Sequence, residues 1–422
     1  MSKTALRNKK WAFACGLACL GAVLLAPSGR HALVNLVPTQ TVQAAPPSDD
    51  TFKRVWTITL PGVRTASLSP DGQSVGVVFD ALGTPGKAKL GLWRWADSPV
   101  KPLWARASPL ASQVAVGPGG RTLVTWARLD PTQKQVSVRR GLNGVQTLAP
   151  ALDGAVWDAQ VSPDGQYAAV STGGHSLYLL SLGDHPKLHR WTLRGLGNSL
   201  AFAPHSDSLT AATWDSSGVS CYSTNGAALW EYPAQPSAAP VAPSRLFEAQ
   251  AAQGGSSTLG VSYSNVRRSD AGLYLWRGVS GGVPCWQYAL GADAYQPKAA
   301  VTADGRYVAV GYLRIITRGE QSVPERRLAF LDTHDDKPLW EQGNLLFAPQ
   351  LVALSPDGTR ITVWDGQRSL YNLNAQGRVT SSYTLRDGGL IRQISATPDG
   401  RFVLVYTGNG QLSLFQIGQS GT

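Results

Sequence analysis

Histidines and aspartates are the residues of this chain that could carry acid–base or metal chemistry. Two histidines, His185 and His189, are four residues apart, but Pro186 between them excludes the helix that would bring both imidazoles together. The sequence contains no nucleophile elbow, phosphate-binding loop or zinc signature. We therefore predict no catalytic and no metal-binding residues, and expect the histidines in solvated turns. The six are His31, His175, His185, His189, His205 and His334.

One aspartate recurs along the chain within a Ser-Pro-Asp-Gly type of turn. Proline presets φ, aspartate hydrogen-bonds its own backbone, and glycine adopts the positive φ that returns the chain. Because a turn residue is needed in every repeat and a catalyst only once, the repetition favours a structural role for these aspartates. The copies span residues 69–72, 117–120 (Gly-Pro-Gly-Gly, without the aspartate), 162–165, 302–305, 355–358 and 397–400; a degraded copy spans 203–207, and residues 253–256 occupy the remaining position.

The elements around these turns predict an all-β fold. Only 15% of the residues are charged, and 45 glycines and 27 prolines indicate many turns. Each turn lies between two short apolar strands, and a third and a fourth strand follow, with a repeated Leu-Trp pair in the fourth. Units of this kind, spaced by roughly 40–55 residues, are typical of propeller blades. We count eight units; seven is the alternative if the weak unit near residue 255 is an insertion, against which Gly272–Trp276 and Val283–Tyr288 argue.

The ends of the repeated region predict how the ring closes. The last unit, Leu390–Ile417, supplies only three strands. The segment Arg54–Leu60 has the character of a fourth strand and precedes the first turn. We therefore expect it to pair with Gln411–Gln416, which protects the sheet edge. The predicted propeller domain spans residues 54–418.

The first residues predict targeting rather than fold. Lys3, Arg7, Lys9 and Lys10 precede the apolar run Trp11–Ala26, which is short for a membrane span and typical of a secretory segment. Residues 1–27 are thus expected to form a signal peptide or a hydrophobic signal-anchor helix, and residues 28–53 a flexible tether. Either outcome places the propeller outside the cytoplasm, periplasmic or at the cell surface, as a secreted or membrane-anchored protein.

The repeats permit a family comparison. The Ser-Pro-Asp-Gly turns resemble the WD40-like repeats of bacterial envelope propellers. The fourth-strand pattern, as in Asn225–Trp230, resembles the tryptophan-docking repeats of PQQ-type propellers. The resemblance covers about residues 54–418 and implies the fold, with tryptophans as apolar plates between blades, but it does not imply one activity.

Two features bear on a PQQ-type enzyme. The resemblance to PQQ-dependent dehydrogenases would imply calcium, a catalytic aspartate and often a vicinal disulfide, but no adjacent cysteine pair exists. We predict no cofactor. Cys221 and Cys285 fall in neighbouring units, and either a disulfide or two buried thiols fits the sequence.

The first strands of the units should line the central channel. They read as largely apolar or neutral, and only Arg64, Asp158, Lys298 and Arg392 are charged. This set is too small and too mixed for a metal or acid–base site. A channel enzyme or small-ligand binder, quinoprotein-like or lactonase- or lyase-like, is therefore the alternative function, and a non-catalytic role is favoured.

The connections between second and third strands differ among units. Four are long, Asp80–Ala88, Ala127–Gln135, Asn265–Ala271 and Leu313–Arg327, and they should face each other across the ring as two lobes. They are also basic, in a chain of net charge +11. The predicted partner-binding residues are Lys87, Lys89, Arg128, Lys134, Arg267, Arg268, Arg314, Arg318, Arg326 and Arg327.

Basic loops on a rigid scaffold predict a protein-interaction scaffold of the cell envelope that binds a protein or another anionic envelope component. The alternative is a set of tolerated insertions whose charges are merely solvated. Nucleic acid is not the expected partner, because no stretch interleaves aromatic and basic side chains as a stacking platform would. The sequence indicates neither the oligomeric state nor the pathway.

Overall fold

The computed structural model describes residues 52–418, except 82–83, 98–99, 129, 131, 133, 142, 184, 214–217, 233–244, 252–256, 265–270, 278–281, 319–320, 336, 344, 346–348, 350–351 and 387–388. The expected hydrophobic helix and nearly all of the expected tether lie outside these residues. None of the described residues forms a helix long and apolar enough to cross a membrane.

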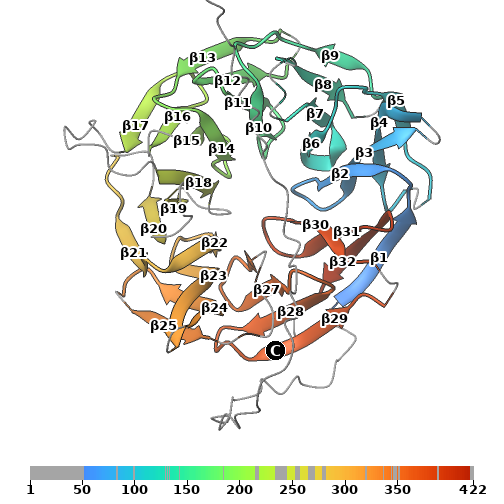
Figure 1. Ribbon diagram of the computed structural model, residues 1–422. Helices are drawn as coiled ribbons and strands as arrows, with labels where there is room; N and C mark the ends of the chain where they lie inside the picture. The colour runs from blue at the N-terminus through green and yellow to red at the C-terminus, as the bar shows by residue number, and fades with distance from the viewer. Residues whose placement is uncertain are drawn as a thin grey trace, which may run out of the picture. The chain divides into compact units, whose positions relative to one another are not determined.

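Eight four-stranded antiparallel sheets follow one another around a ring (Figure 1). Blade 1 consists of β2 (Val63–Leu68), β3 (Ser74–Ala81), β4 (Thr84–Arg94) and β5 (Trp104–Ala107). Blade 2 consists of β6 (Gln113–Val116), β7 (Thr122–Trp126), β8 (Val136–Arg140) and β9 (Gln146–Leu148), with the short 3₁₀ turn η1 (Pro118–Gly120). Blade 3 consists of β10 (Val156–Val161), β11 (Tyr167–Thr172), β12 (Ser176–Ser181) and β13 (Leu188–Thr192). Blade 4 consists of β14 (Gly197–Phe202), β15 (Ser208–Thr213), β16 (Val219–Ser223) and β17 (Ala228–Tyr232).

The second half of the ring repeats this order. Blade 5 consists of β18 (Arg245–Ala251), β19 (Ser257–Ser264), β20 (Ala271–Arg277) and β21 (Trp286–Gly291). Blade 6 consists of β22 (Ala294–Val301), β23 (Tyr307–Arg318), β24 (Gln321–Asp332) and β25 (Pro338–Gln342). Blade 7 consists of β26 (Val352–Leu354), β27 (Arg360–Trp364), β28 (Ser369–Asn374) and β29 (Val379–Thr384). Blade 8 consists of β30 (Ile391–Ala396), β31 (Phe402–Thr407), β32 (Gln411–Ile417) and β1 (Phe52–Thr59).

The count of eight is confirmed, and the seven-bladed alternative is wrong. The weak unit near residue 255 forms a complete sheet, β18-β19-β20-β21. Its turn at residues 253–256 lies outside the described residues, but the strands on both sides are paired from Arg245↔Ser264 to Ala251↔Thr258.

Ring closure by the N-terminal strand is also confirmed. β1 pairs antiparallel with β32 from Phe52↔Ile417 to Thr59↔Gln411, with one bulge between Arg54 and Trp56. The strand begins at Phe52, two residues before the expected start. Phe52, Trp56 and Ile58 are buried against blades 7, 8 and 1, so apolar burial holds the closing strand in addition to its ladder of hydrogen bonds.

The repeated turns are held by the same hydrogen bonds in each intact copy. In blade 7 the Ser355 hydroxyl donates to Asp357 at 2.6 Å, the Thr359 N–H donates to the same carboxylate, and the Arg360 N–H donates to the Ser355 oxygen at 2.9 Å. The fourth turn position needs a positive φ, and the degraded copy preserves it with Ser206 at 58°. The predicted structural role of the turn aspartates is therefore borne out in their contacts.

Tryptophans on outer strands tie neighbouring blades together. The Trp340 indole N–H donates to the Ala375 carbonyl of the next blade at 2.7 Å, and Trp191 donates in the same way to Gly226 at 3.2 Å. Each acceptor lies at a third-to-fourth strand turn. Between these ties, alternating apolar side chains of adjacent sheets form the core, with Trp93, Trp276, Phe330 and Phe415 fully buried.

Two predicted loops are strands. The segment Leu313–Arg327 belongs mostly to a hairpin in which β23 and β24 stay paired out to Arg318↔Gln321. Within the segment Asp80–Ala88, residues 80–81 belong to the end of β3 and residues 84–88 to the start of β4, and residues 82–83 lie outside the described residues. β-Branched residues such as Ile315, Ile316 and Val323 favour extended backbone, which explains why the pairing continues beyond the blade. Most of the expected loop Asn265–Ala271 lies outside the described residues.

Candidate functional site

The ring has two faces that differ in their connections. We call turn face the side that carries the first-to-second and third-to-fourth connections of each blade, and loop face the side that carries the second-to-third and fourth-to-first connections. The repeated Asp-Gly turns lie on the turn face, and the predicted basic segments lie on the loop face.

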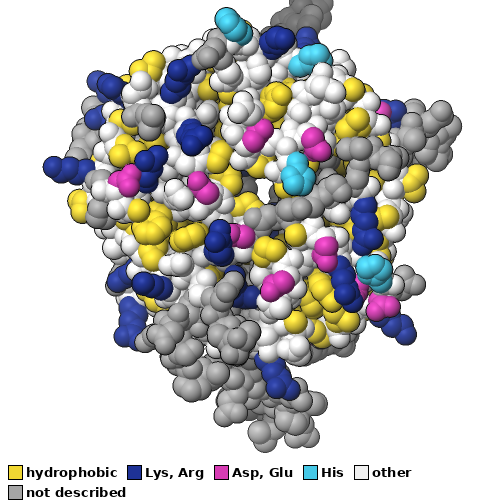
Figure 2. All heavy atoms as spheres, turned by 180° about the vertical axis from the view of Figure 1, so that it is seen from behind, with side chains coloured by type: hydrophobic (Ala, Val, Ile, Leu, Met, Phe, Trp, Pro, Cys, Tyr) yellow, Lys and Arg dark blue, Asp and Glu magenta, His cyan; other side chains and the backbone are white. Residues whose placement is uncertain are grey.

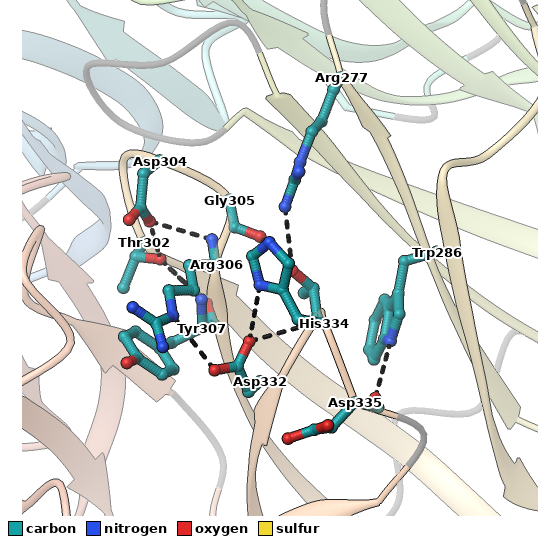
Figure 3. Close-up of polar contacts among 11 residues, drawn as sticks. Arg277, Trp286, Thr302, Asp304, Gly305, Arg306, Tyr307, Asp332, His334 and Asp335 are labelled. Carbon is teal, nitrogen blue, oxygen red and sulfur yellow. Dashed lines mark hydrogen bonds and ion pairs between the residues drawn. The ribbon is translucent and has the colours of Figure 1, made fainter.

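A polar cluster on the turn face of blade 6 has the groups closest in type to an acid–base site (Figure 3). The Asp332 carboxylate accepts hydrogen bonds from Arg306 Nε at 3.1 Å and from the His334 backbone N–H at 3.0 Å, and it lies 3.0 Å from His334 Nδ1. Burial works against ionisation of Asp332, but the contacts with His334 and Arg306 outweigh it and hold the pKa below its ordinary value.

The hydroxyl groups beside this His–Asp pair are already committed. Thr302 donates to Asp304 at 2.7 Å, and Thr333 donates to the Gly305 carbonyl at 2.9 Å while accepting from Arg277 of blade 5 at 3.1 Å. Figure 3 shows Arg277 and Trp286 of blade 5 beside the blade 6 groups, to which they donate hydrogen bonds. The cluster thus fastens the turn and the blade 5–blade 6 boundary. Among the described residues, no three His, Cys, Asp or Glu side chains gather to hold a metal ion.

Two side chains on inner strands link neighbouring blades at the channel. Asp158 on β10 accepts a hydrogen bond from the Leu200 N–H of β14 at 3.0 Å. Gln393 on β30 accepts from the Ala66 N–H of β2 at 3.2 Å and donates to the Ala66 carbonyl at 3.0 Å. Each lies six residues before the turn aspartate of its own blade. The same position within the repeat thus links blade 3 to blade 4 through a carboxylate and blade 8 to blade 1 through a neutral amide.

Burial raises the pKa of Asp158 to about 6, although the Leu200 N–H and the Arg128 guanidinium favour the carboxylate. Asp158 was one of four charged candidates for the channel. Its structural contact is with backbone, and part of the charge of Arg128, a predicted partner-binding residue, acts on it. Asp158 therefore serves to join two neighbouring inner strands.

The extended hairpin of blade 6 brings two predicted basic residues into ion pairs. Arg314 Nε lies 2.7 Å from Asp293, and Arg327 lies 2.7 Å from Glu341 and 2.6 Å from the buried Glu325. The Tyr312 hydroxyl also donates to Glu341. These contacts hold the base of the hairpin, so Arg314 and Arg327 are largely neutralised within the chain.

The other predicted residues have different settings. Lys87, Lys89, Lys134 and Arg326 are exposed and have no carboxylate partner in the described part of the chain. Arg128 is exposed beside the bridge to Val156. Arg318 ends β23, its side chain lies outside the described residues, and so do Arg267 and Arg268.

Carboxylates of the loop face are mostly engaged by arginines. Asp80 pairs with Arg64 at 2.6 Å, Asp153 with Arg190 at 2.7 Å, and Glu231 with Arg194 at 2.6 Å. Together with the three pairs of the blade 6 hairpin, this leaves positive charge without compensation on this face. Sequence reasoning did not predict these pairs, because their partners come from different strands and connections and have no fixed spacing.

Sequence reasoning also missed Arg386, an exposed cation that follows β29 on the loop face. It lies in a fourth-to-first connection, whereas the prediction considered second-to-third connections alone. The charge of every loop-face connection would have been the signal.

The turn face has a different distribution of charge. Figure 2, which views the ring from behind Figure 1, shows acidic side chains around a central opening and most Lys and Arg side chains farther out. Repetition accounts for acidic groups near a channel, because each intact turn contributes one aspartate next to an inner strand.

Both blade-core cysteines are free thiols, so the disulfide left open by the sequence does not form. Cys221 is buried on β16, where burial raises the pKa of its thiol to about 11. Cys285 is exposed and its sulfur lies 3.2 Å from the Leu275 carbonyl.

Comparison with known proteins supports the propeller fold but does not assign the chain to a family. No family model and no curated protein matches the chain. Among solved structures, the Chaetomium thermophilum Sqt1 bound to the N-terminus of the ribosomal protein L10 is similar, with a TM-score of 0.63 and 12% identity over 86% of this chain and 100% of that chain. The C-terminal WD40 domain of Sif2 has a TM-score of 0.57 and 12% identity over 87% of this chain and 99% of that one. The chain therefore has a WD40-like β-propeller fold.

Proposed function

We propose that this protein is a non-catalytic binding module whose loop face holds an acidic segment of a protein partner. One observation carries the proposal: carboxylates on that face are engaged by arginines of the same chain, whereas Lys87, Lys89, Lys134 and Arg326 are exposed without such a partner in the described residues. A surface with uncompensated cations attracts anionic partners and speeds their association.

The scaffold suits this role. Closure of the ring by β1 and the inter-blade tryptophan ties keep the blades at fixed positions relative to one another, which lowers the entropy cost of binding by side chains that the strands carry. The similar fold of Sqt1, solved with the N-terminus of a ribosomal protein, supports a protein segment as the class of partner. The identity of this chain's partner does not follow from that likeness.

The test is binding of a fluorescein-labelled octaglutamate peptide, followed by anisotropy. Replacing Lys87, Lys134 and Arg326 together by glutamine should weaken binding about tenfold at low salt and reduce its salt dependence. The matched control replaces Lys101, Lys187 and Arg378, three exposed cations of the turn face, and should change binding less than twofold. Equal losses in both triple variants, or none in the first, would overturn the proposal.

We further propose that the propeller acts outside the cytoplasm, in the cell envelope, tethered or released there by residues 1–53. The positive residues before the apolar run Trp11–Ala26 support this location. Protease added to intact spheroplasts should digest the propeller, with a cytoplasmic protein as the protected control. Protection of the propeller until the membrane is lysed would refute the location and leave the binding proposal standing.

A further inference from the structure

A pocket lies at the boundary of blades 1 and 2, and none of the exposed cations described above lines it. It has a volume of about 130 Å³ and lies where the chain passes from β5 to β6. Its lining includes Ser108, Leu110, Thr125, Ser137, Arg139 and Gln146. Since a water molecule occupies about 30 Å³ of liquid volume, the pocket has room for a group the size of one short side chain.

The charge inside the pocket comes from Arg139. Its two terminal nitrogens donate to the carbonyls of Gly144 and Ala107, both at 3.0 Å, and its Nε is buried without a partner. No acidic residue lines the pocket within the described part of the chain. Carbonyl oxygens satisfy donors but do not neutralise charge, so the guanidinium remains an uncompensated cation.

Two further features favour an anion at this point. Arg106 lies close enough to Arg139 that, after burial, its charge is the second cause lowering the pKa of the Arg139 guanidinium. An arginine whose pKa is depressed by burial and by a like charge is stabilised when a carboxylate arrives. The lining hydroxyls of Ser108 and Thr125 are nearly buried and have no hydrogen-bond partner in the described residues, so they can donate to the same group.

We propose that this pocket receives a carboxylate side chain of the protein partner, with Arg139 as its receptor and Leu110 as an apolar rim. The inference rests on the proposed function and adds a specificity site to it. General attraction by exposed lysines selects for net charge alone, whereas a pocket for one side chain selects an aspartate or glutamate at one position of the bound segment. Leu110, which is 55% exposed, offers contact to an apolar neighbour of that residue.

Octaglutamate and free glutarate are the probes, because the same chemistry could come from a protein or from a small acid. Arg139→Gln should weaken octaglutamate binding roughly tenfold, because it removes a charge-assisted hydrogen bond to the bound carboxylate. Ser137→Phe keeps the arginine and fills the pocket, and it should cause a similar loss. Arg378→Gln, which removes one exposed arginine of the turn face, should change binding less than twofold.

The outcomes separate this inference from the proposed function. Unfolding midpoints of all variants show whether a loss reflects misfolding, and Ser137→Phe keeps the test valid if Arg139→Gln does not fold. Unchanged octaglutamate binding in both pocket variants overturns the inference while leaving the loop-face proposal intact. Glutarate binding is measured by calorimetry. If Arg139→Gln abolishes glutarate binding but leaves octaglutamate binding unchanged, the pocket belongs to a free small acid, and the inference is likewise overturned. Arg139-dependent glutarate binding with no octaglutamate binding to the wild-type protein refutes the proposed function but supports a carboxylate pocket.

Discussion

The turn face and the loop face of this propeller differ in what their carboxylates hold in place. On the turn face, each intact Asp-Gly turn directs its carboxylate to its own backbone and to a neighbouring hydroxyl, as Asp399 does with Arg401 N–H and Thr397. On the loop face, carboxylates pair with arginines, and cations such as Lys134 and Arg326 remain exposed without a carboxylate partner in the described residues. The carboxylates of the first face thus serve the repeated turns, whereas the exposed cations of the second face are the ones that we assign to a partner.

This difference indicates where to look for function in a repeat protein. A contact that recurs in every blade must answer a need that every blade has, which is to turn the chain and pack on its neighbour. The irregular elements, such as the long hairpin β23–β24 and the Arg139 pocket, occur once each and are free to serve a partner. The comparison holds only if both faces belong to one closed, rigid ring.

The largest expected effect comes from opening that ring. Deletion of residues 52–60 removes the fourth strand of blade 8 and exposes the edge of β32, together with the apolar surface that covers Trp56 and Ile58. We expect the protein to aggregate or to lose its cooperative thermal transition, measured by circular dichroism and size-exclusion chromatography. The comparison of two rigid faces would fail if this deletion gave a soluble monomer with an unchanged melting temperature.

The next largest effect is a pH-dependent change in stability caused by Asp158, on an inner strand between the two faces. Asp158 has a pKa of about 6 in the folded protein and about 3.9 in the unfolded chain, so the folded state binds more protons between these values. Stability should therefore fall as pH rises from about 4 to about 6, by at most about 3 kcal/mol, and then stay level. Asp158→Asn should remove this loss, because the amide still accepts from Leu200 and carries no charge.

Denaturant titrations at pH 4 and pH 7 measure this difference. Gln393→Glu is the matched variant, since it places a carboxylate at the equivalent clamp of another boundary and should introduce a similar loss above pH 6. If Asp158→Asn retains the wild-type pH dependence, then burial of the Asp158 carboxylate does not cause the loss of stability between pH 4 and pH 6.

A turn aspartate should matter less than either, but measurably. Asp399→Ala removes the acceptor of the Thr397 hydroxyl and the Arg401 N–H, and we expect a loss of about 1–2 kcal/mol in the free energy of unfolding. Burial opposes ionisation of Asp399, but its hydrogen bonds with Thr397 and Arg401 hold the pKa below its ordinary value. The carboxylate's contribution is thus present above about pH 4 and lost as pH falls below it. Asp399→Asn should recover part of the loss at neutral pH; equal losses in both variants would contradict an acceptor role.

Sequence and structure agree where a pattern repeats. Blade number, the β1–β32 closure and the turn contacts follow from local residues, because Pro, Asp and Gly specify a turn regardless of what lies elsewhere. The hairpin of blade 6 was mistaken for a loop because its alternation is interrupted by charged residues, whose partners are Asp293 in the β21–β22 turn and Glu341 on β25. The Arg139 pocket could not be predicted, since it forms between a connection of blade 1 and the outer strands of blade 2. Contacts between distant segments carry no periodic signal.

The smallest expected effect is the most direct test of the comparison. If the exposed cations of the loop face serve a partner and not the fold, replacing Lys87, Lys134 and Arg326 by glutamine should leave the free energy of unfolding within about 0.5 kcal/mol of the wild-type value. A slight gain is expected at low salt, because the domain is basic and removing like charges lowers their mutual repulsion. A loss above about 1 kcal/mol, seen in denaturant titrations at both low and high salt, would mean that these side chains hold the fold. The two faces would then not differ in use, and weakened octaglutamate binding by this variant could no longer be attributed to its surface alone.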